Sequence, residues 1–184
     1  QARWIVVLYG NLSALFAQRP DVFVAADNIW YPVEGEPKIA AAPDVYLVFG
    51  RPKGDRPSYK QWEEDNIPLT VVFEIRSPGN DHHELMAKHL FYEEHGVEEY
   101  YEYDPDANRL YAFVRRGGVL ARVRNLRSFV SPRMGIRFEV TDTDLIVYGP
   151  DGERFQTFEE IKAERDKARE RAEQAEQKAR QAEE

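Results

Sequence analysis

The chain has 184 residues, of which 42% are hydrophobic and 12% aromatic, so it is long and apolar enough to bury a sizeable core. It contains no cysteine, which excludes a disulfide framework and thiolate chemistry and fits a reducing, cytoplasmic environment. No apolar run approaches the ~20 residues that span a bilayer, and the net charge of −8 argues against a protein that simply coats nucleic acid.

The first third of the chain predicts a helix, several strands and a loop. Apolar side chains at helical spacing predict an amphipathic helix over residues 3–17. Residues 21–35 alternate as a strand pair or one long bent strand, and residues 42–50 form a short strand closed by Gly50. Residues 51–67 are rich in proline, glycine and charge, which predicts an exposed loop.

The most apolar strand, residues 68–77, is predicted to lie at the centre of its sheet. A turn then leads into a helix from about residue 81 to residue 95. Asp81, with Glu84 three residues later, forms a capping-box pattern at its start. Gly96 is a natural C-cap at its end.

Short strands and a charged tail make up the rest of the chain. Strands are predicted at residues 98–105, 109–117, 119–126 and 136–140, joined as a meander, with one more in 144–155. From Thr157 onward Glu, Lys, Arg, Gln and Ala dominate, which divides the chain into a domain at 1–156 and a helical tail at 157–184.

The tail carries a weak heptad seam. The seam positions follow spacings of four and three and are mostly alanine: Ile161, Arg165, Ala168, Ala172, Ala175, Ala179 and Ala182. A coiled coil that makes a homodimer is one interpretation. A solvated single helix held by i,i+4 charge pairs is the other.

Positive charge is concentrated in one segment of this acidic chain. Between Arg109 and Arg137 there is no acidic residue, and the eight arginines stand at positions 109, 115, 116, 122, 124, 127, 133 and 137. Such a segment could face phosphates. Alternatively, its arginines pair with acids from elsewhere in the chain.

A carboxylate stands inside the strand that is predicted to be central. The apolar neighbours of Glu74 imply a strand covered on both faces, where a carboxylate must be paired, protonated or bound to a metal. Asp44 opens a strand expected nearby, and two converging carboxylates would suit Mg²⁺ or Mn²⁺. The alternative is an ion pair between Glu74 and Arg76, which project to the same face of the strand.

A lysine on the following helix could reach the same carboxylate. Leu85, Lys88 and Tyr92 lie at i, i+3 and i+7, so Lys88 interrupts a stripe that would otherwise face the sheet. Its ammonium could extend toward Glu74, or it could form a surface i,i+4 pair with Glu84. The chain has no zinc-site spacing, GxSxG elbow, P-loop or GxGxxG, so those chemistries have no support.

The segments "APDVYLVFG", "VVFEIRSPGND" and "GVEEYYEYDPD", with Lys88 and Tyr92 between the last two, resemble the Uma2-type restriction endonuclease family. This family is a branch of the PD-(D/E)XK nuclease superfamily, and the resemblance covers roughly residues 1–150. It implies a restriction-endonuclease-like fold of the α+β or α/β class, with a mixed β-sheet flanked by helices and a divalent metal between strands. The charged C-terminal helix would be appended to this fold.

The resemblance also implies roles for individual residues. Asp44 and Glu74 match the two metal-binding motif positions, and Asp27 matches a further acidic position near the site. The superfamily lysine usually stands two residues after the glutamate, where this chain has Arg76. Lys88 would supply the ammonium instead, and Tyr92 matches a recurrent aromatic residue on the same helix.

The function implied by the resemblance is a Mg²⁺- or Mn²⁺-dependent endonuclease that hydrolyses phosphodiester bonds in DNA. Its backbone contacts would come from Arg115, Arg116, Arg122 and Arg124. Two departures stand out: residues 1–19 contain no acid, and relatives tend to carry an aliphatic residue where Arg76 stands. The alternative function is a catalytically inactive nuclease-fold binding or assembly protein that joins a partner through the tail.

Overall fold

The computed structural model describes residues 1–79 and 81–183, and side chains as far as Gln181. Asn80 of the predicted turn and the side chain of Ala182 in the predicted seam lie outside this description. Within the described residues, no helix has the length and apolar character needed to cross a membrane.

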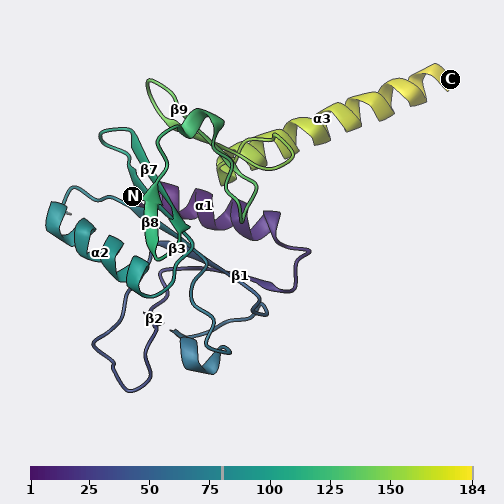
Figure 1. Cartoon of the computed structure of the whole chain (residues 1–184). Coiled ribbons are helices and arrows are strands. Elements are labelled where there is room, and N and C mark those ends of the chain that lie inside the picture. Colours follow the sequence, from purple (N-terminus) through teal and green to yellow (C-terminus); the bar gives the residue numbers. More distant parts are fainter. Residues whose placement is uncertain (80, 184) are drawn as a thin grey trace.

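A mixed sheet of six strands organises the molecule (Figure 1), in the order β1-β3-β5-β6-β7-β8. The strands are β1 (Val22–Ala26), β3 (Val45–Phe49), β5 (Val71–Ile75), β6 (Glu99–Asp104), β7 (Arg109–Arg116) and β8 (Val119–Arg122). Neighbours are antiparallel except β5 and β6. Because parallel neighbours need a crossover connection, the chain passes through helix α2 (His82–Glu94) between them.

The predicted ends of α2 are confirmed. The Asp81 carboxylate accepts a hydrogen bond from the backbone N–H of Glu84 at 2.8 Å, which satisfies one of the unpaired donors of the first turn. Gly96 follows the helix with a φ of +89°, a conformation that glycine adopts without steric cost.

Helix α1 (Ala2–Leu15) packs against one face of the sheet. Leu8 and Leu12, one helical turn apart, are buried there in the same core as Val71 and Phe73 of β5. The same face is also covered by β9 (Arg137–Val140) and β10 (Leu145–Tyr148), an antiparallel pair that forms a separate small sheet.

The predicted four-strand meander is therefore wrong at its last strand. The chain leaves the large sheet after Arg122 and turns through a short 3-10 helix, η2 (Leu126–Ser128). Asn125 caps η2 by accepting the N–H of Arg127 at 3.1 Å. Leu126 and Phe129 then pack on the core beneath, so the following strand finds its partner in β10.

The opposite face is covered by α2 and by a short parallel pair, β2 (Trp30–Tyr31) and β4 (Tyr59–Lys60). Aromatic side chains dominate this second core. Trp30 and Tyr59, together with Tyr92 of α2, have no exposed surface. This layer fixes α2 over β5 and β6.

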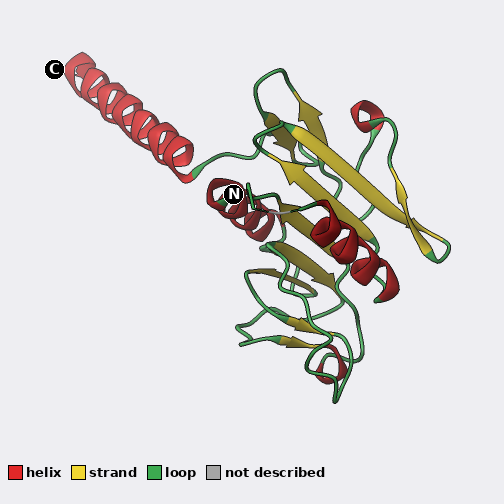
Figure 2. Cartoon of the chain, turned by 90° about the vertical axis from the view of Figure 1, so that its left-hand side faces the viewer, coloured by secondary structure: helices red, strands yellow, loops and turns green. Residues whose placement is uncertain are grey.

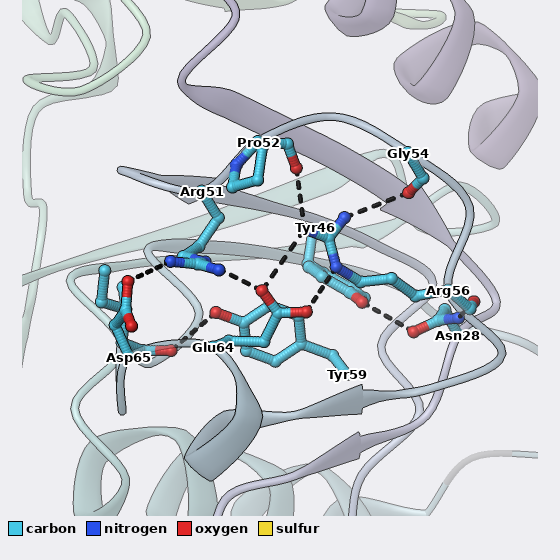
Figure 3. A network of polar contacts seen from close by, with 10 residues as sticks. Asn28, Tyr46, Arg51, Pro52, Gly54, Arg56, Tyr59, Glu64 and Asp65 are labelled. Carbon is cyan, nitrogen blue, oxygen red and sulfur yellow. Dashed lines mark hydrogen bonds and ion pairs between the residues drawn. The ribbon is translucent and has the colours of Figure 1, made fainter.

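The loop predicted to be exposed between β3 and β5 is instead fastened by a partly buried ion cluster (Figure 3). Glu64 accepts hydrogen bonds from Arg51 at 2.8 Å and from Arg56 at 2.5 Å, and it is only 9% exposed. The Arg56 guanidinium lies 4.1 Å from the centre of the Phe23 ring. Tyr59 donates to the carbonyl of Ile67 at 2.8 Å. Composition alone does not reveal that these charges satisfy one another.

Helix α3 (Phe158–Glu183) projects away from the remainder of the chain (Figures 1 and 2). Near its start, Phe158 is 70% and Ile161 48% exposed. Further along, i,i+4 pairs such as Arg169–Glu173 at 2.9 Å support the helix. The helix that the sequence predicts in the tail is thus formed.

Candidate active site

The site begins with the way β5 is covered on both faces. Side chains alternate along a strand, so Val71, Phe73 and Ile75 enter the core under α1, whereas Val72 enters the core under α2. Glu74 shares the face of Val72 and is only 3% exposed. A carboxylate is thereby carried into the layer between the sheet and α2, where it needs hydrogen-bond donors.

Helix α2 supplies these donors. The ammonium nitrogen of Lys88 donates to Oε2 of Glu74 at 2.9 Å, and the hydroxyl of Tyr92 donates to Oε1 at 2.5 Å. Lys88 and Tyr92 are four residues apart, so they lie one above the other on the same side of the helix. Each carboxylate oxygen of Glu74 therefore has its own donor.

Asp44 stands across from Glu74 on the neighbouring strand. The antiparallel register pairs Val45 with Phe73, and one further step places Asp44 opposite Glu74. Its Oδ2 accepts the backbone N–H of Ile75 at 2.7 Å. This contact holds the Asp44 carboxylate at the end of β5.

Asp27 lies beside Asp44 at the same edge of the sheet. Its backbone N–H donates to the Asp44 carbonyl at 3.2 Å, and its φ of +48° marks the turn that ends β1. The Asp27 side chain is exposed. The structure thus gathers four of the residues predicted for the site, Asp44, Glu74, Lys88 and Tyr92, and places Asp27 at its margin.

The buried carboxylate has a perturbed pKa. Burial raises the pKa of Glu74 to about 7, with a further contribution from the charge of Asp44, against the opposing effects of Lys88 and Tyr92. Burial alone would lower the pKa of Lys88, but attraction to Glu74 outweighs it, so that pKa is raised. Burial also raises the pKa of Tyr92, whose hydroxyl remains a donor.

The alternative ion pair between Glu74 and Arg76 is not formed. Arg76 donates to Glu102 of β6 at 2.6 Å, and its guanidinium lies 3.5 Å from a carboxylate oxygen of Asp104. Strands β5 and β6 are in parallel register, with Glu74 opposite Glu102. The two neighbouring acids thus use different cations, Lys88 for the first and Arg76 for the second.

The two carboxylates could serve as ligands for a hard divalent ion that keeps much of its hydration water. Asp44 and Glu74 offer carboxylate oxygens, and the described residues contain no group of three or more His, Asp or Glu that could enclose a metal. Mg²⁺ is commonly held by one or two carboxylates, with phosphate and water completing its octahedron. Two hydrogen bonds leave lone pairs available on the Glu74 oxygens.

The four arginines that were predicted to contact the DNA backbone differ in the contacts that they make within the protein. Arg115 donates to three backbone carbonyls, those of Val97 at 2.8 Å, Glu93 at 2.6 Å and Gly118 at 3.2 Å. All three guanidinium nitrogens of Arg115 therefore already donate to carbonyl groups of the protein. The other three are exposed and have no ion pair among the described residues: Arg116, Arg122 and Arg124.

Arg124 contributes to a cluster of arginines that the sequence did not single out. With Arg127 and Arg137 it lines a pocket of about 600 Å³ between the end of β8 and the β9–β10 pair. None of the three has an ion-pair partner in the part of the chain that the structure describes. The signal in the sequence was the acid-free segment itself, but it did not show which arginines converge.

Comparisons with known proteins agree with this fold. The sequence model of a family described as "Uma2: Putative restriction endonuclease" matches residues 2–151. The crystal structure of a protein titled a putative nuclease belonging to DUF820, from Anabaena variabilis, has a TM-score of 0.52 and 12% sequence identity. The match covers 71% of this chain and 72% of that chain. At this identity the likeness shows a shared fold, and it confirms the predicted fold class. No curated protein matches the chain.

Replacing Lys88 by methionine should destabilise the protein in a pH-dependent manner. The folded-state pKa of Glu74 is raised, so its protonation contributes stability that is lost as pH rises through about 7. Without Lys88 the carboxylate is harder to ionise. We expect a loss of about 1 kcal/mol at about pH 5, where Glu74 is protonated with or without Lys88. At about pH 8 the loss should be larger by about 1 kcal/mol, because the wild-type carboxylate is ionised beside Lys88 whereas the variant keeps its carboxyl protonated.

Urea denaturation at both pH values would measure this difference. Lys60→Met is a matched control, because Lys60 pairs with Glu63 on the surface at 3.6 Å. Its effect should stay below about 1 kcal/mol at both pH values. Equal losses at both pH values for Lys88→Met would contradict the coupling to Glu74.

Proposed function

The chain belongs to the Uma2 family, and we propose that it is a divalent-metal-dependent endonuclease acting on DNA phosphodiester bonds. One observation carries the proposal. A buried carboxylate, Glu74, faces Asp44 and receives hydrogen bonds from a lysine and a tyrosine of the next helix. A purely structural ion pair would not require the second carboxylate at the same point of the sheet.

In this proposal Asp44 and Glu74 hold Mg²⁺ or Mn²⁺. When bound, such an ion withdraws charge from the phosphate and acidifies water. Lys88, whose raised pKa keeps it an ammonium, would orient the attacking water or neutralise charge on the pentavalent phosphate. Tyr92 holds the Glu74 carboxylate in one orientation through its hydroxyl.

The DNA backbone would run along exposed arginines. Arg116, Arg122 and Arg124 are candidates because their guanidinium groups have no carboxylate partner among the described residues. Arg127 and Arg137 extend this set through the pocket that they share with Arg124. Arg115 is left out, because its donors are used by backbone carbonyls.

The first test is metal-dependent nicking of supercoiled plasmid DNA at low salt. Wild-type protein should nick with Mg²⁺ or Mn²⁺, chelation should abolish the reaction, and Glu74→Ala should reduce it to background. Tyr92→Phe, which removes only a hydroxyl that positions Glu74, should lower the rate about tenfold. Agarose gel electrophoresis over a time course measures both effects.

Wild-type protein that is inert on DNA and RNA with either metal would overturn this function. Titration calorimetry with Mn²⁺ then identifies the alternative. Mn²⁺ heat that disappears in Asp44→Asn supports the metal site, whereas no heat favours a catalytically inactive binding or assembly protein. An ion pair between Arg76 and Glu74 would have favoured that alternative. The guanidinium of Arg76 instead donates to Glu102.

A second test addresses the backbone contacts. The double variant Arg124→Gln, Arg137→Gln should weaken DNA binding without changing sequence preference, because phosphate contacts carry no sequence information. The slope of log K against log salt should become shallower by about 0.7–0.9 for each lost phosphate contact. Fluorescence anisotropy in the presence of chelator measures it.

Arg133→Gln is the matched control for this measurement. Arg133 is an exposed arginine of the same segment, but it already pairs with Glu98 at 2.5 Å. Its removal should leave the salt slope nearly unchanged. A slope that changes equally for Arg133→Gln and for the double variant would show that the arginine pocket has no special role.

We also propose that residues 157–184 join two copies of the chain. Phe158 and Ile161 are exposed apolar side chains at the start of a helix whose described side chains are exposed along most of its length. Removing residues 157–184, or introducing Ile161→Lys, should convert a dimer to a monomer in sedimentation equilibrium. Lys162→Ala, off the seam, should not. An unchanged subunit number after truncation would refute the proposal.

A further inference from the structure

A second pocket, of about 460 Å³, lies between α2 and the β6–β8 part of the sheet. Helix α2 lines it with residues that recur at i, i+3, i+4 and i+7, namely His82, Leu85, Met86 and His89. The sheet lines it with Arg76, Glu102, Tyr111, Phe113 and Arg122. Its volume lies within the range of small-molecule pockets.

The pocket is adjacent to the Glu74 site. Glu102, one of its lining residues, is the register partner of Glu74 on the neighbouring parallel strand. Neighbouring strands lie about 4.8 Å apart. Leu85 and Lys88, three residues apart on α2, face the pocket and Glu74 respectively. A nucleotide whose phosphate lies at Glu74 would therefore have this pocket within reach of its base.

The walls of the pocket are flat and aromatic. Tyr111 and Phe113 are two residues apart on β7, so they present their rings on the same face. Phe113 stacks on Tyr100 with ring centres 5.6 Å apart and meets His89 edge-on at 4.6 Å. These contacts hold Phe113 in place, while part of its surface remains open to the pocket.

The charges of the pocket favour an anionic, planar ligand. Glu102 is neutralised within the fold, because Arg76 donates to one of its oxygens at 2.6 Å and Tyr100 to the other at 3.2 Å. Arg122 lies 5.0 Å from the centre of the Tyr111 ring and has no ion pair among the described residues. One uncompensated guanidinium thus stands at the rim, beside the rings.

We propose that this pocket receives an unpaired nucleobase of the substrate strand, with Arg122 contacting the phosphate that follows it. The inference rests on the proposed function and specifies its substrate class as single-stranded or unpaired DNA. Aromatic rings and guanidinium planes bind any base by stacking. A base in a duplex enters such a pocket only after it is unpaired and unstacked, which costs free energy.

The test compares two strands of equal length, oligothymidylate and an abasic deoxyribose-phosphate strand, by fluorescence anisotropy in chelator. Wild-type protein should bind oligothymidylate more tightly than the abasic strand and than the corresponding thymidine–adenine duplex. Tyr111→Ala should weaken oligothymidylate binding about tenfold and leave the abasic strand unchanged. Tyr111→Phe, which keeps the ring, should bind as the wild type does.

Two further variants keep the test decisive. Met86→Trp places a large ring at an exposed α2 position on the pocket, so it should block base binding even if Tyr111→Ala fails to fold. Tyr9→Ala removes an exposed tyrosine from α1, on the other face of the sheet, and should change nothing. Equal losses on both strands, no loss on either, or tighter binding of the duplex would overturn the inference.

The outcome is separate from that of the nuclease assay. Binding is measured without metal, so base-selective binding that depends on Tyr111 would stand even if the protein cleaves nothing. The converse result is also possible. If Tyr111→Ala and Met86→Trp do not change metal-dependent nicking, and binding shows no base selectivity, the proposed function stands and this inference is overturned.

Discussion

Burial of the Glu74 carboxylate constrains how β5, β3 and α2 pack together. A carboxylate that is 3% exposed must be given donors or must lose its charge. The parallel pairing of β5 with β6 requires a crossover helix, and this helix brings Lys88 and Tyr92 to the two oxygens of Glu74. The antiparallel register of β3 brings Asp44 to the same point. The contacts that make the strand stable are therefore also the contacts that would prepare a metal ligand.

Two acids stand side by side on β5 and β6, and the fold gives each a different cation. Glu102 takes Arg76, and Glu74 takes Lys88. If Arg76 paired with Glu74, Glu102 would be buried at 6% exposure without a cation, at a cost of several kcal/mol. Because Arg76 pairs with Glu102, it does not form an ion pair with Glu74. Lys88 is on a flexible stem and partly exposed, so it would be easier to displace than Arg76 if a metal competed for the same oxygens.

Features that depend on local patterns could be predicted from the sequence. Periodicity located both packed helices and most strands, and the i, i+3, i+7 spacing of Leu85, Lys88 and Tyr92 indicated that a lysine faces the sheet. The partners of charged residues could not be predicted in the same way, because they depend on contacts between distant segments. Nothing in the composition around Glu64 indicates that Arg51 and Arg56 enclose it. Likewise, Arg115 turns inward to backbone carbonyls, while Arg124 remains unpaired beside the β9–β10 pair.

The same long-range pairing explains how an acidic chain can present a basic surface. Glu64, Glu74, Glu99 and Glu102 are buried, so they add to the formal charge of −8 but little to the outer surface. Glu99 is satisfied without any cation, by the hydroxyls of Tyr101 at 2.6 Å and Ser131 at 2.5 Å and by the Arg133 N–H at 2.7 Å. The other three buried acids pair with cations that lie outside the acid-free segment. Arginines of that segment, such as Arg122 and Arg124, therefore stay unpaired on the outside of the described part of the chain. A polyanion responds to this local potential rather than to the net charge, and the unpaired arginines line both the β8–β9 pocket and the rim of the pocket beside Glu74.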